Sequence, residues 1–171
     1  MMMARLKQFY DSHIGLPIDP DATEPGIVGR PIHTHPGLMI IVFVGGSLGA
    51  LAHYGVMCIV PYSSGRWPLA TFLVNLTGAF VLGLLLQTLV NRGADEGLRR
   101  LFRLGIGTGF LGAFTTYSTF AVEVDLLLNQ HRISMAVTYA VGSLVGGMML
   151  TALGIYIATN HHHGRHTGVN V

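Results

Sequence analysis

The sequence predicts an all-α membrane protein with four transmembrane helices, the third of which is broken. Half of the 171 residues (50%) are hydrophobic and only 11% are charged, and the mean hydropathy is +0.53, far from the averages of soluble domains. Four apolar segments are long enough to cross about 30 Å of hydrocarbon, and the third contains a run of glycines and hydroxyl residues. The formal net charge of +2 is too small to indicate nucleic acid binding.

The N-terminal segment, residues 1–36, is predicted to be a flexible tail that precedes a transmembrane domain at 37–159. It is rich in X-Pro pairs and lacks the apolar core and small-residue cleavage site of a signal peptide. His33 and His35 are expected to be solvated, because a zinc site needs further ligands.

The first predicted span covers residues 38–60. Its small residues form a face on which another helix can pack closely. Two pairs spaced by four residues make up this face: Gly45 with Gly49, and Gly46 with Ala50. His53 is the polar exception near the far end of the span. Its ring is expected either to supply positive charge to a water-filled mouth when protonated or to be hydrogen bonded at the interface.

The second predicted span covers residues 69–90 and contains Asn75, which shares a helix face with Thr71 and Gly78. A carboxamide within the bilayer is costly unless it is paired. Asn75 is therefore expected either to hydrogen bond to another helix or to line a pore. The charged segment after this span, residues 91–103, is predicted to be a solvated loop.

The third predicted span, residues 104–128, is the one we expect to be broken. Glycine lowers the cost of leaving helical geometry, and hydroxyl side chains can satisfy the backbone groups that a break releases. The stretch contains both kinds of residue: Gly105, Gly107, Gly109, Gly112, Thr115, Thr116, Ser118 and Thr119. Non-helical backbone at membrane depth is tolerated where it is buried in protein or lines a wet cavity, so the break predicts an ion or substrate site.

Side chains beyond the predicted break carry further expectations. Tyr117 and Phe120 are three residues apart and share a face if the helix resumes. Glu123 lies near the end of the span. Its carboxylate is expected to be interfacial or, as we prefer, to have a structural hydrogen-bonding role.

The fourth predicted span covers residues 133–159 and carries a polar stripe at successive i, i+4 positions: Tyr139, Ser143, Gly147 and Thr151. Such a ladder of hydroxyls could carry an ion, or it could serve helix packing. The remainder, residues 160–171, is predicted to be a C-terminal tail. Its histidines support a metal site only weakly, because a flexible tail does not fix ligand geometry.

An enzyme is not expected. The pattern Gly-x-Gly-x-x-Gly at 107–112 matches the dinucleotide-binding fingerprint by letter, but its flanks are apolar over membrane length and no strand precedes it. The sequence has no Walker lysine and no zinc-site spacing of cysteine and histidine.

The stretch Gly112-Ala-Phe-Thr-Thr-Tyr-Ser-Thr-Phe120, followed by Glu123, resembles the signature of the CrcB/Fluc fluoride-channel family. Gly45-Gly-Ser-Leu-Gly-Ala50 with Tyr54, and Val74-Asn75-x-x-Gly78, extend the resemblance over roughly residues 40–158. The resemblance implies a passive fluoride-selective channel that exports fluoride from the cytoplasm, built as an antiparallel dual-topology dimer. Residues 37–159 would then form the channel domain.

The resemblance also implies roles for individual residues. Those implied to line the pore are Asn75, Tyr117, Phe120, Tyr139, Ser143 and Thr151. His53 takes the vestibule position at which the family commonly has Arg, Tyr117 replaces a common Phe, and Gly147 replaces a common hydroxyl residue. Backbone carbonyls of Gly112 and Thr115 from both subunits are implied to hold one structural Na⁺ that is not transported.

Charge distribution predicts the orientation in the membrane. An even number of spans places both termini on one side, where eight of the ten Lys and Arg residues lie: Arg5, Lys7, Arg30, Arg92, Arg99, Arg100, Arg103 and Arg165. The other side has Arg66 and Arg132. The positive-inside rule therefore predicts cytoplasmic termini in the cell membrane. A homodimer is expected from the family, while a heterodimer with an inverted paralogue stays open because a strong charge bias opposes dual topology.

Two rival functions remain open. The main one is a small four-helix exporter of drugs or cations coupled to protons, which needs a membrane-embedded acid, typically in the first span. Residues 38–60 contain no Asp or Glu, which argues against this rival. The other is a structural scaffold with no transport.

Overall fold

The computed structural model describes residues 36–63 and 65–167, with side chains up to His161. The chain divides into two units, Met1–Pro36 and Gly37–Val171, of which the second contains the helical bundle. The predicted N-terminal tail at 1–36 lies outside the described residues except for Pro36. All regular structure in the described part is helical, with no strand. The predicted all-α class is therefore confirmed.

Three of the helices are uninterrupted, and each has an apolar segment that is long enough to cross a membrane by length and composition. They are α2 (Pro36–Ile59), α3 (Leu69–Val90) and α7 (Ile133–Thr167). The first two agree with the predicted spans within two residues. The last continues beyond residue 159, so the predicted start of the C-terminal tail at 160 was too early. Hydropathy detects only the apolar part of a helix, whereas the helix itself continues as long as its backbone hydrogen bonds are favourable.

The third predicted span is broken, as expected. Its pieces are α4 (Leu98–Phe102), the π-helix η2 (Arg103–Leu111), α5 (Gly112–Phe114) and α6 (Ser118–Asn129). The helix starts at Leu98, so the prediction of a loop up to residue 103 was wrong. Arg99, Arg100 and Arg103 are therefore helical, whereas Asp95 lies in the preceding turn, where its Oδ2 accepts from Arg103 Nε at 2.8 Å.

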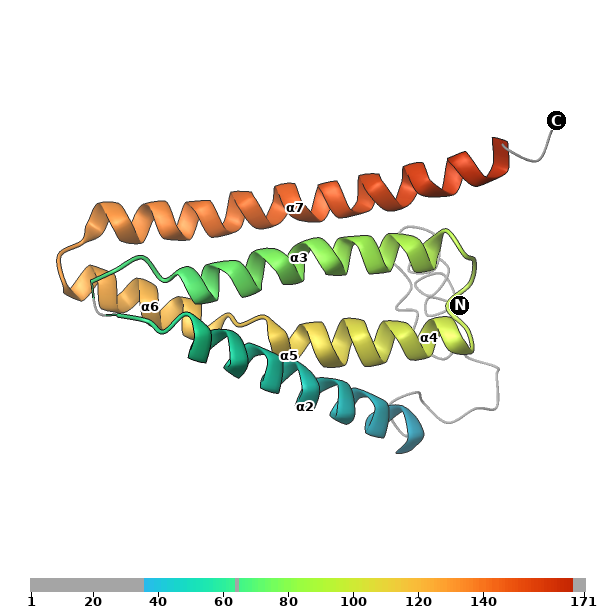
Figure 1. The fold of residues 1–171 in the computed structure, drawn as a ribbon, viewed down its shortest axis with the longest axis horizontal. Coiled ribbons are helices and arrows are strands. Elements are labelled where there is room, and N and C mark those ends of the chain that lie inside the picture. Colours follow the sequence, from blue (N-terminus) through green and yellow to red (C-terminus); the bar gives the residue numbers. More distant parts are fainter. Residues whose placement is uncertain (1–35, 64, 168–171) are drawn as a thin grey trace, which may run out of the picture. The chain divides into compact units, whose positions relative to one another are not determined.

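Helices α3 and α7 run side by side in the same direction and form the most extensive contact between elements (Figure 1). Small residues allow this approach, because a methyl group added at Gly83 would lie 2.5 Å from the carbonyl oxygen of Thr151. The Thr151 hydroxyl in turn donates to the carbonyl of Ala79 at 3.2 Å. One face of α7 is therefore held against the backbone of α3.

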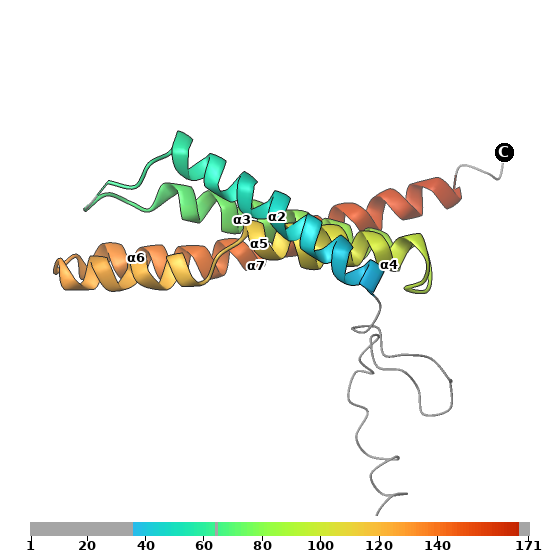
Figure 2. The same cartoon turned by 90° about the horizontal axis from the view of Figure 1, so that it is seen from below.

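Helix α2 crosses the broken helix obliquely (Figure 2), and its glycines contact the π-helix directly. A methyl group added at Gly45 would overlap the carbonyl oxygen of Gly105, and one added at Gly49 would overlap that of Phe110. On the other side, a Cβ at Gly109 would lie 2.8 Å from the carbonyl oxygen of Val42. Of the small-residue face predicted for the first span, the pair Gly45 and Gly49 thus packs on η2, whereas Ala50 is exposed.

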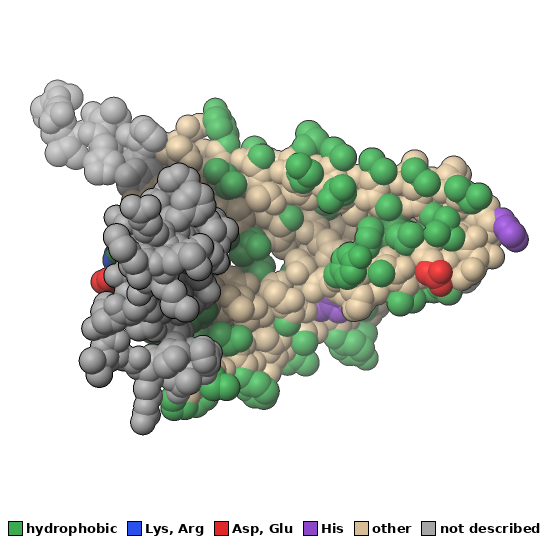
Figure 3. All heavy atoms as spheres, turned by 180° about the vertical axis from the view of Figure 1, so that it is seen from behind, with side chains coloured by type: hydrophobic (Ala, Val, Ile, Leu, Met, Phe, Trp, Pro, Cys, Tyr) green, Lys and Arg blue, Asp and Glu red, His purple; other side chains and the backbone are tan. Residues whose placement is uncertain are grey.

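The core lies at the end of the bundle where α6 meets α7. Leu127, Ala136 and Tyr139 are its fully buried members, and partly buried Trp67, Phe72 and Phe120 pack against them. The outer surface is also apolar. The face in Figure 3 carries hydrophobic side chains along its length and charged ones only towards its ends. An apolar exterior of this kind suits a lipid environment.

Candidate functional site at the helix break

The break occupies Thr115 to Tyr117, between the last residue of α5 and the first residue of α6. Thr115 has φ −81° and ψ 156°, an extended conformation that ends the helix. A helix end leaves carbonyls without donors and a helix start leaves N–H groups without acceptors. Within a membrane these groups must find partners in the protein or in a wet cavity.

Asn75 of α3 satisfies both backbone groups of Thr116. Its Nδ2 donates to the Thr116 carbonyl at 2.9 Å, and its Oδ1 accepts from the Thr116 N–H at 2.8 Å. The interhelical hydrogen bond, one of the two roles expected for Asn75, is therefore present. Because the side-chain amide has a second N–H on Nδ2, one donor remains for a further partner.

Thr116 also starts the second half of the helix. Its Oγ1 accepts from the backbone N–H of Thr119 at 3.2 Å and so satisfies one N–H of the first turn of α6. The regular bonding then resumes with the N–H of Ala121 donating to the Tyr117 carbonyl at 2.9 Å. The Thr116 hydroxyl thus does what the sequence predicted of the hydroxyl residues in this stretch, which is to satisfy freed backbone.

His53 of α2 serves the other side of the break. Its Nδ1 lies 2.8 Å from the carbonyl oxygen of Phe114, the last residue of α5. Because a carbonyl only accepts, Nδ1 must carry the hydrogen, which leaves Nε2 free for a further contact. The hydrogen-bonded alternative expected for His53 is therefore present, while its role in a vestibule stays a prediction.

Several carbonyls at the break are left without a donor. Among the residues that the structure describes, no donor reaches the carbonyl oxygens of Gly112, Ala113 and Thr115. The Thr115 side chain is held in place, since its Oγ1 donates to the Leu111 carbonyl at 2.9 Å and its methyl group contacts Gly78. Hard cations prefer oxygen ligands of this type. The residues present therefore fit the Na⁺ that the family resemblance implies.

Aromatic rings follow the break on one side of α6. The Tyr117 side chain is 82% exposed, and its ring centroid lies 6.2 Å from that of half-buried Phe120. Phe120 in turn lies 5.2 Å from the ring of Tyr139. The helix resumes at Ser118, so the shared face expected for Tyr117 and Phe120 is confirmed.

Glu123 lies one turn beyond these rings and is 5% exposed. Its Oε1 accepts from the Thr71 hydroxyl at 2.8 Å and its Oε2 accepts from the Tyr139 hydroxyl at 2.7 Å. Both donors are fully buried. The preferred structural role for Glu123 is therefore confirmed, and Thr71, Asn75 and Gly78 share the face of α3 that lies along the broken helix.

The substitution Tyr139→Phe is expected to lower the free energy of unfolding by about 1–3 kcal/mol, because it leaves Glu123 Oε2 buried without a donor. The matched control is Tyr156→Phe on the same helix, where the side chain is 64% exposed, and this change is expected to be nearly neutral. Unfolding in detergent micelles, followed by the fluorescence of Trp67, measures both. Equal stabilities of the two variants would show that the Tyr139 hydroxyl contributes nothing to the fold.

The remaining members of the polar stripe on α7 are dispersed. Ser143 Oγ is buried and has no hydrogen-bond partner in the described part of the chain. The hydroxyl of Thr151 is occupied by the Ala79 carbonyl. Thr151 lies twelve residues from Tyr139, about 18 Å along the helix, and its contact is with α3. The pore-lining roles of Tyr139, Ser143 and Thr151 stay predictions.

Two features of this site were not found by sequence reasoning. The first is the π-helix η2. Its closely spaced glycines were interpreted as part of the break, whereas they lie in a regular helix with a wider turn. The second is the pairing of Thr71 with Glu123, for which a hydroxyl in the first turn of an apolar helix was the available signal. The described residues hold no group of three or more His, Cys, Asp or Glu side chains that could bind a metal. His33 and His35 lie outside the described residues, as do the side chains of the histidines beyond His161.

Residues 40–155 match the family model described as CrcB-like protein, Camphor Resistance (CrcB). The chain is 43% identical over 125 residues to a protein of Leifsonia xyli subsp. xyli named "Fluoride-specific ion channel FluC 2", with 73% of this chain and 86% of the relative covered. It is 41% identical to "Fluoride-specific ion channel FluC 1" of Cutibacterium acnes, covering 67% and 80%. It is 35% identical to "Fluoride-specific ion channel FluC" of a Methylobacterium species, covering 73% and 97%.

Proposed function

This chain belongs to the CrcB-like family, and on that premise we propose that it is a fluoride-selective channel through which fluoride leaves the cytoplasm passively. The three relatives carry the name of fluoride-specific ion channels. The chain itself is a multi-pass membrane protein, with three uninterrupted apolar helices and one broken helix, which is the third along the chain. Family and topology together support a transport function.

The observation that carries the proposal is the break, where the aromatic rings on one side of α6 lie close to several polar groups. Fluoride holds its hydration shell strongly, so a path must replace water at each step without binding the ion too tightly. Ring edges carry positive partial charge and can contact an anion weakly. Phe120, between Tyr117 and Tyr139, would present such an edge.

Hydrogen-bond donors would complement the rings. Asn75 retains one amide N–H after its bonds to Thr116. The Ser143 hydroxyl is buried and has no partner among the described residues, so it has a donor to offer a passing anion. Tyr139 and Thr151 would contribute less directly, because their hydroxyls already donate to Glu123 and to the Ala79 carbonyl.

A second subunit would complete the pore. Tyr117 is next to the break, yet 82% of its side chain is exposed in the single chain, which suits a ring that a partner covers. The family resemblance implies an antiparallel homodimer, and a heterodimer with an inverted paralogue is the alternative that the charge bias favours. Either assembly would bring a second copy or counterpart of every polar group to the break.

Na⁺ would have a structural part in this assembly. The carbonyl oxygens of Gly112 and Thr115, which have no donor among the described residues, would hold the ion together with their counterparts in the partner. Bound there, the cation would neutralise the partial negative charge of the carbonyls and join the two subunits. It would not be transported.

The driving force would be the membrane potential. With the termini in the cytoplasm, as the positive-inside rule favours, a negative interior pushes an anion outward by about 2.3 kcal/mol per 100 mV. Hydrogen fluoride enters as a neutral acid and dissociates, so a selective path for the anion lowers its internal concentration. Neither a nucleotide site nor any enzymatic activity is needed.

Fluoride efflux from liposomes that contain the purified chain, recorded with a fluoride-selective electrode, tests the proposal. We expect efflux without any proton or drug gradient, and Phe120→Ile is expected to slow it about threefold to tenfold through loss of the ring edge. The control is Phe43→Ile on α2, where the side chain is 73% exposed and the rate should not change.

The outcomes separate the alternatives. Efflux that requires an opposing proton gradient would indicate a proton-coupled exporter, for which buried Glu123 is the available membrane acid. No efflux from a folded dimer would indicate a scaffold. Equal slowing by both phenylalanine variants would place the path away from α6.

A further inference from the structure

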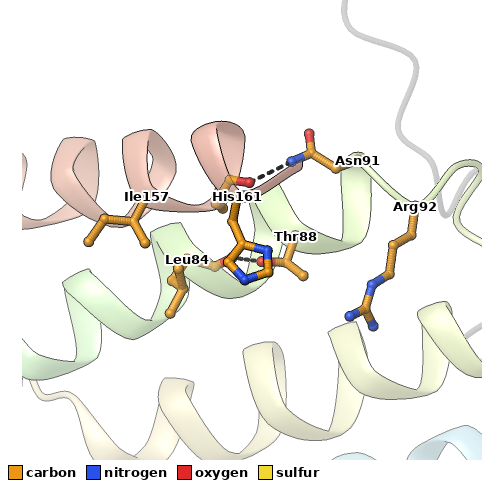
Figure 4. Close-up of a pocket in the computed structure, with 7 residues that line it drawn as sticks. Leu84, Thr88, Asn91, Arg92, Ile157 and His161 are labelled. Atoms are coloured by element: carbon orange, nitrogen blue, oxygen red, sulfur yellow. Dashed lines mark hydrogen bonds between the residues drawn. The ribbon is translucent and has the colours of Figure 1, made fainter. Parts of the chain in front are cut away.

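A groove lies between α3 and α7 at the end of the bundle where α3 stops (Figure 4). Its cavity volume is about 270 Å³, just below the roughly 300–1,000 Å³ of pockets that enclose whole small molecules. The lining residues are Leu84, Thr88, Asn91, Arg92, Ile157, Ala158 and His161. A space of this size suits one end of a larger ligand.

The groove has fixed walls. Asn91 Nδ2 donates to the carbonyl of Ala158 at 3.0 Å and so ties the end of α3 to α7 (Figure 4). Its Oδ1 accepts from Gln87 Nε2 at 2.8 Å, which orients the amide. The Thr88 hydroxyl donates to the carbonyl of Leu84 at 2.6 Å. Asn91 and Thr88 therefore shape the groove, and most of their donors are already used.

Polarity changes along the groove in one direction. Leu84, Thr88 and Arg92 are spaced by four residues on α3 and the turn after it, and Ile157 and His161 have the same spacing on α7, about 6 Å per step. Because the two helices run in the same direction, Leu84 and Ile157 lie at the membrane side while Arg92 and His161 lie at the outer end. The groove thus passes from hydrocarbon depth to headgroup depth.

The charged end of the groove is basic. Arg92 and His161 are both exposed, and no Asp or Glu is among the lining residues. The backbone of Arg92 is held in place, because its carbonyl accepts from Arg99 Nη1 at 3.2 Å. A guanidinium and an imidazole at headgroup depth favour a phosphate group.

We propose that this groove binds an anionic phospholipid, with its phosphate at Arg92 and His161 and the start of an acyl chain over Leu84 and Ile157. Basic pockets between membrane helices are suited to such headgroups. The proposal rests on the membrane location of α3 and α7 and does not depend on which ion the protein conducts.

Native mass spectrometry of the full-length protein, titrated with phosphatidylglycerol or with phosphatidylcholine of the same acyl chains, tests this site. We expect phosphatidylglycerol to be retained about fivefold more per basic residue that contacts it. The double variant Arg92→Gln/His161→Gln should reduce this excess to the phosphatidylcholine level. Arg66→Gln, which removes an exposed cation at the opposite end, should retain the full excess.

Further arms distinguish the remaining occupants. Millimolar inorganic phosphate should not displace phosphatidylglycerol, since the apolar part of the groove contributes to binding. Displacement by phosphate would overturn the lipid in favour of a free anion. Equal retention of both lipids by the unmodified protein would also overturn the proposal. So would an excess of phosphatidylglycerol that survives the double variant in a folded sample. That last result is expected if a second copy of the chain covers the groove.

Discussion

Gly49→Ala is expected to lower the free energy of unfolding by about 3 kcal/mol or more, or to prevent assembly of the bundle. An added Cβ would overlap the carbonyl oxygen of Phe110 and would lie 2.9 Å from its carbonyl carbon and 3.0 Å from its Cα. These atoms are backbone of the π-helix, so no rotamer change can relieve the overlap. Relief requires α2 and η2 to separate, which would also pull His53 away from the Phe114 carbonyl.

Gly55→Ala is the matched control, because it makes the same chemical change on the same helix. A methyl group at Gly55 meets nothing within 4 Å, so the variant should be neutral or stabilised by up to about 1 kcal/mol through helix propensity. Thermal unfolding in micelles, followed by the fluorescence of the single tryptophan, Trp67, compares the two. Similar midpoints for both variants would contradict close contact between α2 and η2.

Asn75→Leu is expected to cost about 1–3 kcal/mol for each of the two backbone groups of Thr116 that it leaves without a partner. The size of the side chain is nearly kept, so lost hydrogen bonds and not a cavity cause the effect. Fluoride efflux should fall together with stability, because the same amide holds the break and retains one N–H for the anion. Denaturant unfolding and the liposome assay measure the two quantities on one preparation.

Two variants calibrate this result. Asn75→Asp keeps an acceptor for the Thr116 N–H but, when ionised, replaces the donor to its carbonyl by a buried charge, so the variant should be at least as unstable as Asn75→Leu. Asn129→Leu makes the same substitution at an exposed position on α6, where a change of no more than about 0.5 kcal/mol is expected. A loss at Asn129 as large as at Asn75 would contradict a specific role for the amide.

The broken helix is supported on two sides, by the glycine face of α2 and by the polar face of α3. Much of the backbone at the break therefore has hydrogen-bond partners. The carbonyls of Gly112 and Thr115 have no donor within the described residues, and their role as Na⁺ ligands stays a prediction.

The sequence by itself determined the helical class, the approximate spans and the position of the break. Each of these depends on local properties. Apolar length decides whether a segment can cross hydrocarbon, and a backbone in lipid must satisfy its own groups, so a run rich in glycine and hydroxyls indicates where regular helix ends. The ends at Leu98 and Thr167 were missed because polar turns continue a helix without adding hydropathy.

Only the tertiary structure decided which partners meet. Asn75 with Thr116, and His53 with Phe114, are separated by 41 and 61 residues, and each pairing depends on how one helix is rotated about its axis against another. A helix that is apolar on most of its surface does not record that rotation in its hydropathy. The rotation is decided by close packing at a few glycines and by the need to pair buried polar groups, and both depend on the neighbouring helices.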